Sequence, residues 1–157
     1  MDNVKRVEEF LNKFGLKDNI LTFKESSATV EMAAKAAGTA PERIAKTLSF
    51  VTKDRYLVIV VAGNMKIDNS KYKAEFHDKA HMVAYDDVLL KIGHPVGGVC
   101  PFAVNEGVEV YLDVSLKKYE TVFPACGATN NAIEITPAKL EEITNMIKWV
   151  DVCKESI

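Results

Sequence analysis

Residues 44–62, IAKTLSFVTKDRYLVIVVA, form the stretch that decides the fold. The segments Ile44–Thr52 and Tyr56–Ala62 are rich in β-branched, aromatic and other large apolar residues, a composition that favours strands. Lys53-Asp54 lies between them and suits a tight turn. We therefore predict two antiparallel strands joined as a hairpin.

Helices are expected on both sides of this hairpin. Apolar residues at helical spacing predict an amphipathic helix over Val4–Phe14, and Thr29 can cap a second helix over Met32–Ala37. Three more helices are predicted: residues 70–76 after a cap at Asp68 or Asn69, residues 87–92 after Asp86, and residues 137–150 after the cap and first-turn proline Thr136-Pro137.

Further strands are expected at residues 108–112, 121–123 and 132–135, with a turn at Asn130-Asn131. Strict alternation of strand and helix is missing, so a doubly wound parallel fold is disfavoured. The pattern predicts an α/β protein of the α+β kind, in which helices pack around a mixed sheet.

Length and composition favour one soluble domain spanning residues 1–157, because 48% of the residues are hydrophobic and 27% are charged. The net charge of -2 provides no broad basic field, so DNA is not an expected partner and any RNA contact must be local. No apolar run approaches the roughly 20 residues that span a bilayer, and no signal peptide is evident, so we expect a cytoplasmic protein. Three widely spaced cysteines predict reduced thiols. Neither a metal nor a cofactor is expected.

Lys46 is the most informative single residue. In a strand that begins at Ile44 it shares parity with Leu48 and Phe50, which should face inward. A buried ammonium needs a carboxylate, a set of carbonyls or an anionic ligand. The alternatives are a lysine near the strand end whose ammonium reaches water, or a strand register that differs by one residue.

Two glycine-containing loops are candidate walls of a site. The first, residues 93–102 (GHPVGGVCPF), contains glycines that leave backbone N–H groups uncovered, so it can hold a carbonyl oxygen, an oxyanion or a ribose. The second, residues 125–131 (ACGATNN), precedes a predicted strand. Each loop is equally compatible with a purely structural connection.

Two other constellations compete with this interpretation. His94 and Cys100 lie in one loop and can form a nucleophilic pair, although Cys100 also suits a small core position. His77 and His81 have the spacing of two metal ligands on a helix, but a third ligand is not evident, which favours exposed histidines.

The ordered motifs resemble those of the YbaK/prolyl-tRNA synthetase-associated editing domain family. The matching residues extend from about Ala28 to Leu140 and are Ala45-Lys46-Thr47-Leu48, Gly97-Gly98-Val99-Cys100-Pro101, Asp113-Val114-Ser115-Leu116, Gly127, and the run from Ala132 to Pro137. The resemblance implies a curved, mixed, mostly antiparallel sheet and a pocket for the aminoacylated 3′ end of tRNA.

It also implies a trans-editing hydrolase that cleaves the aminoacyl ester of Cys-tRNA(Pro) or Ala-tRNA(Pro), with prolyl-tRNA synthetase as a candidate partner. By residue matching, Lys46 orients the terminal phosphate and ester, and Gly97 and Gly98 belong to the catalytic loop. The same matching places these residues at the substrate: Val99, Cys100, Pro101, Asp113, Ala125 and Gly127. Many relatives carry serine where this chain has Ala125.

In some relatives the thiol of a cysteinyl substrate attacks the ester, and in others water does. The alternative function is a non-catalytic module that senses or binds an amino acid or aminoacyl-tRNA in the same pocket.

Overall fold

The computed structural model describes residues 2–26 and 29–156. Its longest ladder is the predicted hairpin, in which β2 (Ile44–Thr52) pairs antiparallel with β3 (Arg55–Ala62). The register runs from Ala45 opposite Ala62 to Thr52 opposite Arg55, and Lys53 takes a left-handed conformation (φ 56°) in the turn. The hairpin prediction is confirmed.

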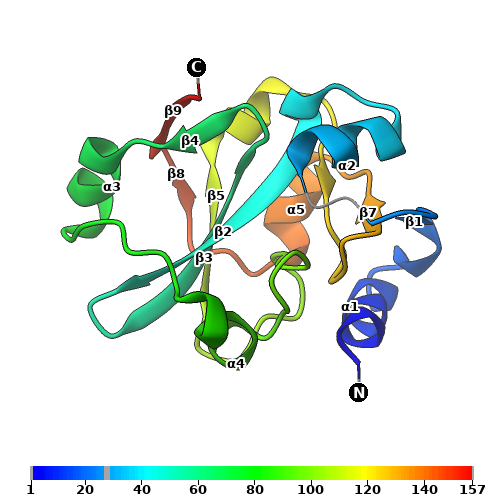
Figure 1. Cartoon of the computed structure of the whole chain (residues 1–157), viewed down its shortest axis with the longest axis horizontal. Helices are drawn as coiled ribbons and strands as arrows, with labels where there is room; N and C mark the ends of the chain where they lie inside the picture. The colour runs from blue at the N-terminus through cyan, green and yellow to red at the C-terminus, as the bar shows by residue number, and fades with distance from the viewer. Residues whose placement is uncertain (1, 27–28, 157) are drawn as a thin grey trace.

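A five-stranded mixed sheet is built on this hairpin, in the order β6-β2-β3-β5-β8 (Figure 1). The joins of β2 to β6, β3 to β5 and β5 to β8 are parallel and short, whereas the antiparallel β2–β3 ladder is long. Two antiparallel strand pairs, β1–β7 and β4–β9, complete the strands. The remaining bounds are β1 Ile20–Thr22, β4 Met65–Ile67, β5 Glu109–Asp113, β6 Phe123–Pro124, β7 Asn131–Ile133, β8 Trp149–Val150 and β9 Cys153–Glu155. The predicted mixed sheet is confirmed.

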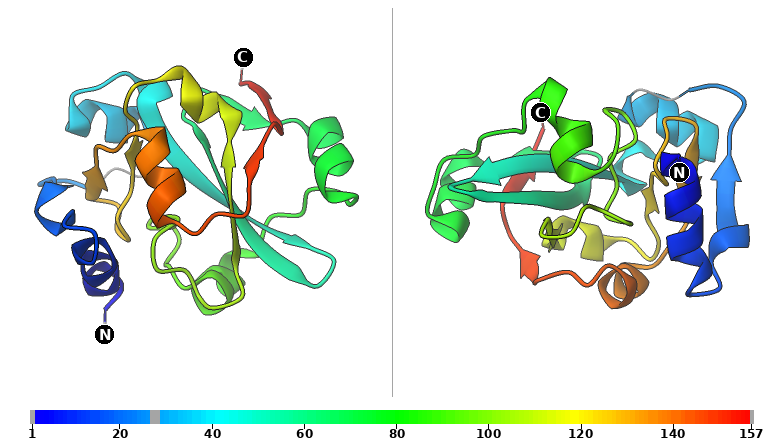
Figure 2. Two further views of the ribbon diagram at one scale, coloured as in Figure 1. Left: turned by 180° about the vertical axis from the view of Figure 1, so that it is seen from behind. Right: turned by 90° about the horizontal axis from the view of Figure 1, so that it is seen from below.

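Helices cover both faces of the sheet (Figures 1 and 2). On one face, Val60 and Leu112 pack with residues of α1 (Asn3–Asn12) and α5 (Pro137–Ile143), and Val58 packs with α4 (Val88–Ile92). On the other face, Ile59 packs with α3 (Asn69–Phe76) and β9. At one edge, α2 (Val30–Ala37) covers the start of β2 beside β6. Short 3-10 helices span Lys17–Asn19, Pro41–Arg43, Tyr85–Asp87 and Val114–Lys118.

Helix caps follow from local sequence. The side chains of Thr29 and Thr136 accept hydrogen bonds from backbone N–H groups three residues later, and Asp68 accepts from Ser70 and Lys71. The α4 helix begins at Val88 without a side-chain cap, so the predicted cap at Asp86 is wrong. Within the described residues no helix is long and apolar enough to cross a bilayer.

The last helix is shorter than predicted. It ends at Ile143 because the Thr144 hydroxyl donates to the Leu140 carbonyl (2.6 Å) and Asn145 has a positive φ of 53°. The chain then turns back, and Ile147 N–H donates to Val110 O (2.8 Å). Residues 149 and 150 join the sheet as its edge strand β8, which pairs with β5. The prediction of a helix that continues to residue 150 is therefore wrong, and Ile147 is 53% exposed.

Candidate functional site

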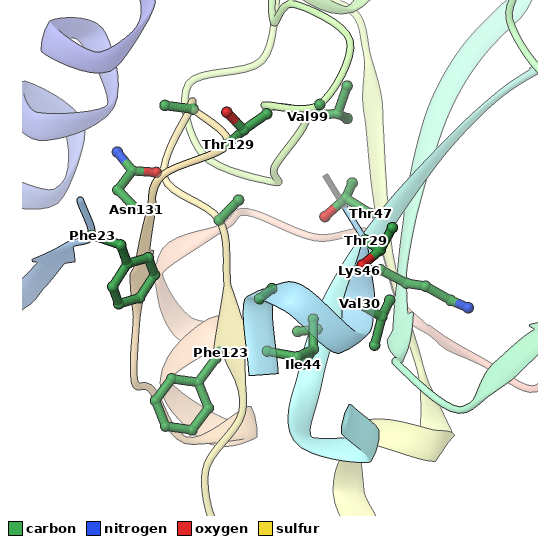
Figure 3. A pocket seen from close by; sticks show the side chains of 15 residues that line it. Phe23, Thr29, Val30, Ile44, Lys46, Thr47, Val99, Phe123, Thr129 and Asn131 are labelled. Atoms are coloured by element: carbon green, nitrogen blue, oxygen red, sulfur yellow. The ribbon is translucent and has the colours of Figure 1, made fainter. Parts of the chain in front are cut away.

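A cavity of about 220 Å³ opens where the start of β2 meets α2 and two loops (Figure 3). One is the glycine loop, residues 93–103, and the other is the second loop, residues 125–131. The lining residues are Phe23, Thr29, Val30, Ala33, Ile44, Ala45, Lys46, Thr47, Gly97, Val99, Phe123, Ala125, Ala128, Thr129 and Asn131. These residues come from sequence segments that lie far apart, so only the folded chain forms the cavity.

The lining of the cavity is mainly apolar, with a few polar groups. Its polar side chains are three threonines, one asparagine and Lys46. Among the described residues that line it there is no carboxylate, imidazole or thiol. Such a surface suits a neutral ligand with one anionic group near Lys46, and chemistry there must come from positioning and hydrogen bonding.

Lys46 lies at the side of the cavity. Its face of β2 also presents Leu48 and Phe50 to the core beneath α3, which agrees with the predicted parity. The ammonium lies 3.4 Å from Gly63 O, and in Figure 3 it points away from Phe23. Burial lowers the pKa of Lys46, partly offset by the nearby Cys153 and by Glu31. The cation is thus partly desolvated and held by a long contact that a ligand anion can replace.

Thr47 is a cavity residue that sequence reasoning did not identify. Its side chain projects into the cavity from the opposite face of β2 to Lys46 (Figure 3). The hydroxyl oxygen is buried, and it has no hydrogen-bond partner within the described part of the chain. An unpartnered buried hydroxyl is costly, so a ligand or water in the cavity would satisfy it. In the sequence, the signal that could have identified Thr47 was its position next to Lys46 in the same predicted strand.

The glycine loop contributes backbone donors. Gly97 and Val99 line the cavity, and no acceptor among residues 2–26 and 29–156 lies within hydrogen-bonding reach of their N–H groups. Gly98 N–H, by contrast, donates to Pro95 O (2.9 Å) and closes a turn. The N–H groups of Gly97 and Val99 therefore have no hydrogen-bond partner in the described part of the chain, and a ligand oxygen is a candidate acceptor for them.

The two loops meet at glycines. A Cβ on Gly97 would lie 2.6 Å from Thr129 Cγ2, and one on Gly98 would lie 2.5 Å from Gly127 O. Asn131 fixes the second loop, because its side-chain amide accepts from Cys126 N–H (3.0 Å) and donates to Cys126 O (3.1 Å). The loops form one continuous wall of the cavity.

Four of the predicted site residues line the cavity, namely Lys46, Gly97, Val99 and Ala125. The others do not line it: Gly98, Cys100, Pro101, Asp113 and Gly127. Asp113 is 1% exposed and its carboxylate accepts from the backbone N–H groups of Ser115 and Val152, both at 2.9 Å. Such a carboxylate stabilises a strand end and a neighbouring segment. Sequence reasoning also missed the aromatic residues Phe23 and Phe123.

The Cys100–His94 pair is close but unsuited to nucleophilic catalysis. Sγ lies 3.5 Å from Nε2, yet both side chains are 0% exposed. Burial raises the pKa of Cys100 to about 12 and lowers the pKa of His94. His94 Nε2 is 2.6 Å from Phe102 O, so its ring is engaged with the backbone. A thiol that stays protonated and inaccessible is inert.

The predicted alternative of a metal at His77 and His81 also lacks support. Both histidines are exposed, and His77 forms the left-handed end of α3. Within the described ranges no cluster of three potential metal ligands occurs.

The chain is similar to known proteins over most of its length. The model of the aminoacyl-tRNA editing domain family matches residues 24–143. Uncharacterized protein YwhH of Bacillus subtilis is 47% identical over 154 residues, covering 98% of both chains. The proline–tRNA ligase of Thermosipho melanesiensis is 28% identical over 137 residues, which are 87% of this chain but only 24% of the ligase. A solved structure described provisionally as a trans-editing enzyme for prolyl-tRNA synthetase has a TM-score of 0.88 at 25% identity and covers 98% of each chain.

Proposed function

Because the chain belongs to the aminoacyl-tRNA editing domain family, we propose that it acts in trans as a hydrolase on mischarged aminoacyl-tRNA. The observation that carries the proposal is the mainly apolar cavity with Lys46 beside it and with Gly97 and Val99 in its wall, whose N–H groups have no acceptor among the described residues. An aminoacyl ester is neutral where the amino acid joins the ribose and anionic at the neighbouring phosphate. The cavity offers both environments next to each other.

In this proposal Lys46 holds the phosphate of the terminal nucleotide, and the ester lies against the glycine loop. Water attacks the carbonyl carbon, the bond to the ribose oxygen breaks, and a proton passes to that oxygen, giving a free amino acid and a tRNA hydroxyl. The N–H groups of Gly97 and Val99 stabilise the negative charge that develops on the carbonyl oxygen. The Thr47 hydroxyl orients the water or the ester. An aminoacyl ester is already activated, so positioning and electrostatics supply most of the rate.

The substrate proposed is tRNA(Pro) carrying alanine or cysteine. Four alanines at positions 33, 45, 125 and 128 line the small cavity, and they offer apolar contact without polar partners for a charged amino-acid side chain. A cysteinyl substrate brings its own thiol as a nucleophile, so the cavity, whose described lining contains no thiol, need not supply one. The relation to proline–tRNA ligases makes prolyl-tRNA synthetase the proposed partner.

A deacylation panel tests the proposal. Purified protein is mixed with Ala-tRNA(Pro), Cys-tRNA(Pro) and correctly charged Pro-tRNA(Pro), each with and without prolyl-tRNA synthetase, and release of the amino acid is followed. We expect hydrolysis of one or both mischarged species and little hydrolysis of Pro-tRNA(Pro). Tight binding of mischarged tRNA without turnover under all conditions would instead establish the sensing function.

A further inference from the structure

The first helix contacts both loops of the cavity wall without lining the cavity itself. We infer that Asn3 and Arg6 of α1 are positioning residues that set the two loops for the proposed reaction. The inference rests on the proposed function. Helix α1 lies before residues 24–143, so the family match does not include these contacts.

Arg6 holds the two ends of the glycine loop together. Its guanidinium donates to Gly93 O (2.9 Å) and to Ala103 O (2.5 Å). Both acceptor residues have positive φ, 103° at Gly93 and 55° at Ala103, so the chain is sharply turned at each end. Arginine stays charged and its planar fork can reach two carbonyls at once, which a lysine cannot match. One side chain therefore fixes the span of the loop that carries Gly97 and Val99.

Asn3 joins the glycine loop to the second loop. Its Nδ2 donates to Gly127 O (2.7 Å), and its Oδ1 lies 2.8 Å from His94 Nδ1. The approach is close, since a Cβ on Gly127 would lie 2.9 Å from Asn3 Nδ2 and 3.0 Å from Val7 Cγ2. Asn3 and Arg6 are three residues apart and share one face of α1. Together they act on both sides of the seam where Gly98 meets Gly127.

This seam sets the position of Gly97 and Val99 in the cavity wall. If the glycine loop moves relative to Thr129, the N–H groups of Gly97 and Val99 move with it and lose the placement that the proposed reaction requires. Displacements of about 1 Å in such a site can lower a rate by about 100-fold. Arg6 and Asn3 thus affect the rate of the proposed reaction indirectly, by fixing the positions of the two loops.

The test compares Arg6→Ala with Lys5→Ala, a charge-matched control on the same helix whose side chain is exposed. Hydrogen exchange of residues 93–103 and 125–131 is measured together with the kcat and KM of deacylation. We expect Arg6→Ala to speed exchange in the glycine loop by about tenfold or more and to leave residues 44–62 unchanged. Its kcat should fall about 10- to 100-fold with less than about a threefold change in KM. Lys5→Ala should match wild type in both measurements.

Two further variants sharpen the result. Arg6→Lys should recover part of the lost kcat, and Asn3→Asp, which removes the donor to Gly127 O, should speed exchange mainly in the second loop. Equal loop exchange in Arg6→Ala and Lys5→Ala would overturn the inference, as would a uniform increase that includes the β2–β3 hairpin. If wild type shows no deacylation, the proposed function fails, but the exchange data still decide whether Asn3 and Arg6 position the loops.

Discussion

Replacing Lys46 by methionine removes the ammonium and keeps an unbranched apolar stem of similar length. Within the described residues the ammonium makes one long hydrogen bond, 3.4 Å to Gly63 O, so its loss removes little native structure. Burial lowers the pKa of Lys46, which means that the fold disfavours the charged form. We therefore expect the free energy of unfolding to stay within about 1 kcal/mol of wild type or to rise slightly.

The effect on catalysis should be much larger. A hydrogen bond to a charged group contributes about 1.5–3 kcal/mol, and each 1.4 kcal/mol corresponds to about a tenfold change in rate. Because Lys46 is half-buried and partly screened, we expect kcat/KM for deacylation to fall about 10- to 100-fold. Lys66→Met, which removes an exposed lysine from β4, is the matched control and should keep wild-type kinetics.

Deacylation under single-turnover conditions and urea unfolding are measured on the same preparations of both variants. A Lys46→Met protein that unfolds like wild type and deacylates at the wild-type rate would refute the role of the cation. A loss of more than about 3 kcal/mol in stability would show instead that Lys46 acts as a structural residue.

The remaining predictions concern the loops and the buried groups behind them. Gly98→Ala should reduce the free energy of unfolding by about 1–3 kcal/mol and lower the rate of deacylation, because its Cβ would lie 2.5 Å from Gly127 O. The control is Gly107→Ala, whose Cβ would meet open space at a positive φ, and this variant should keep wild-type activity. Burial raises the pKa of Cys100 to about 12, so iodoacetamide should not modify this thiol in the native protein at pH 8. The variant Cys100→Ala should still deacylate its substrate. A folded but inactive Cys100→Ala protein would instead indicate that the thiol is the nucleophile. Burial lowers the pKa of His94, so the unfolded chain binds more protons below about pH 6.5 and stability should fall as pH drops through that region. His94→Gln should reduce this dependence in urea unfolding at pH 7 and pH 5.5, and an unchanged slope would contradict the assignment.

The sequence predicted the elements whose determinants are local. The β2–β3 hairpin follows from two β-rich runs and a turn dipeptide, and the starts of α2 and α5 follow from capping threonines. It failed at the end of α5, where helical spacing continued to Val150 but the chain left the helix to pair with β5. Pairing with a strand that is distant in sequence depends on tertiary structure, and the hydrophobic periodicity of a segment does not predict it.

The site shows the same division. Lys46 and the glycine loop stood out because a cation in an apolar strand and clustered glycines are unusual in a linear sequence. Phe23, Thr47 and Phe123 did not stand out, since each is ordinary in its own segment and becomes a cavity residue only when distant elements meet. The family resemblance predicted that Asp113 contacts the substrate. In the structure its carboxylate accepts hydrogen bonds from two backbone N–H groups and does not line the cavity.

Sequence alone thus determined the class of fold, the family resemblance and the most prominent cation, because these depend on residue type and short-range pattern. Tertiary structure decided which faces meet: that α1 contacts both loops, that residue 98 must lack a side chain for those loops to touch, and that the Thr47 hydroxyl is buried without a partner among the described residues. The physical reason is that backbone propensity acts over a few residues, whereas close packing and hydrogen-bond satisfaction act between segments far apart in the chain.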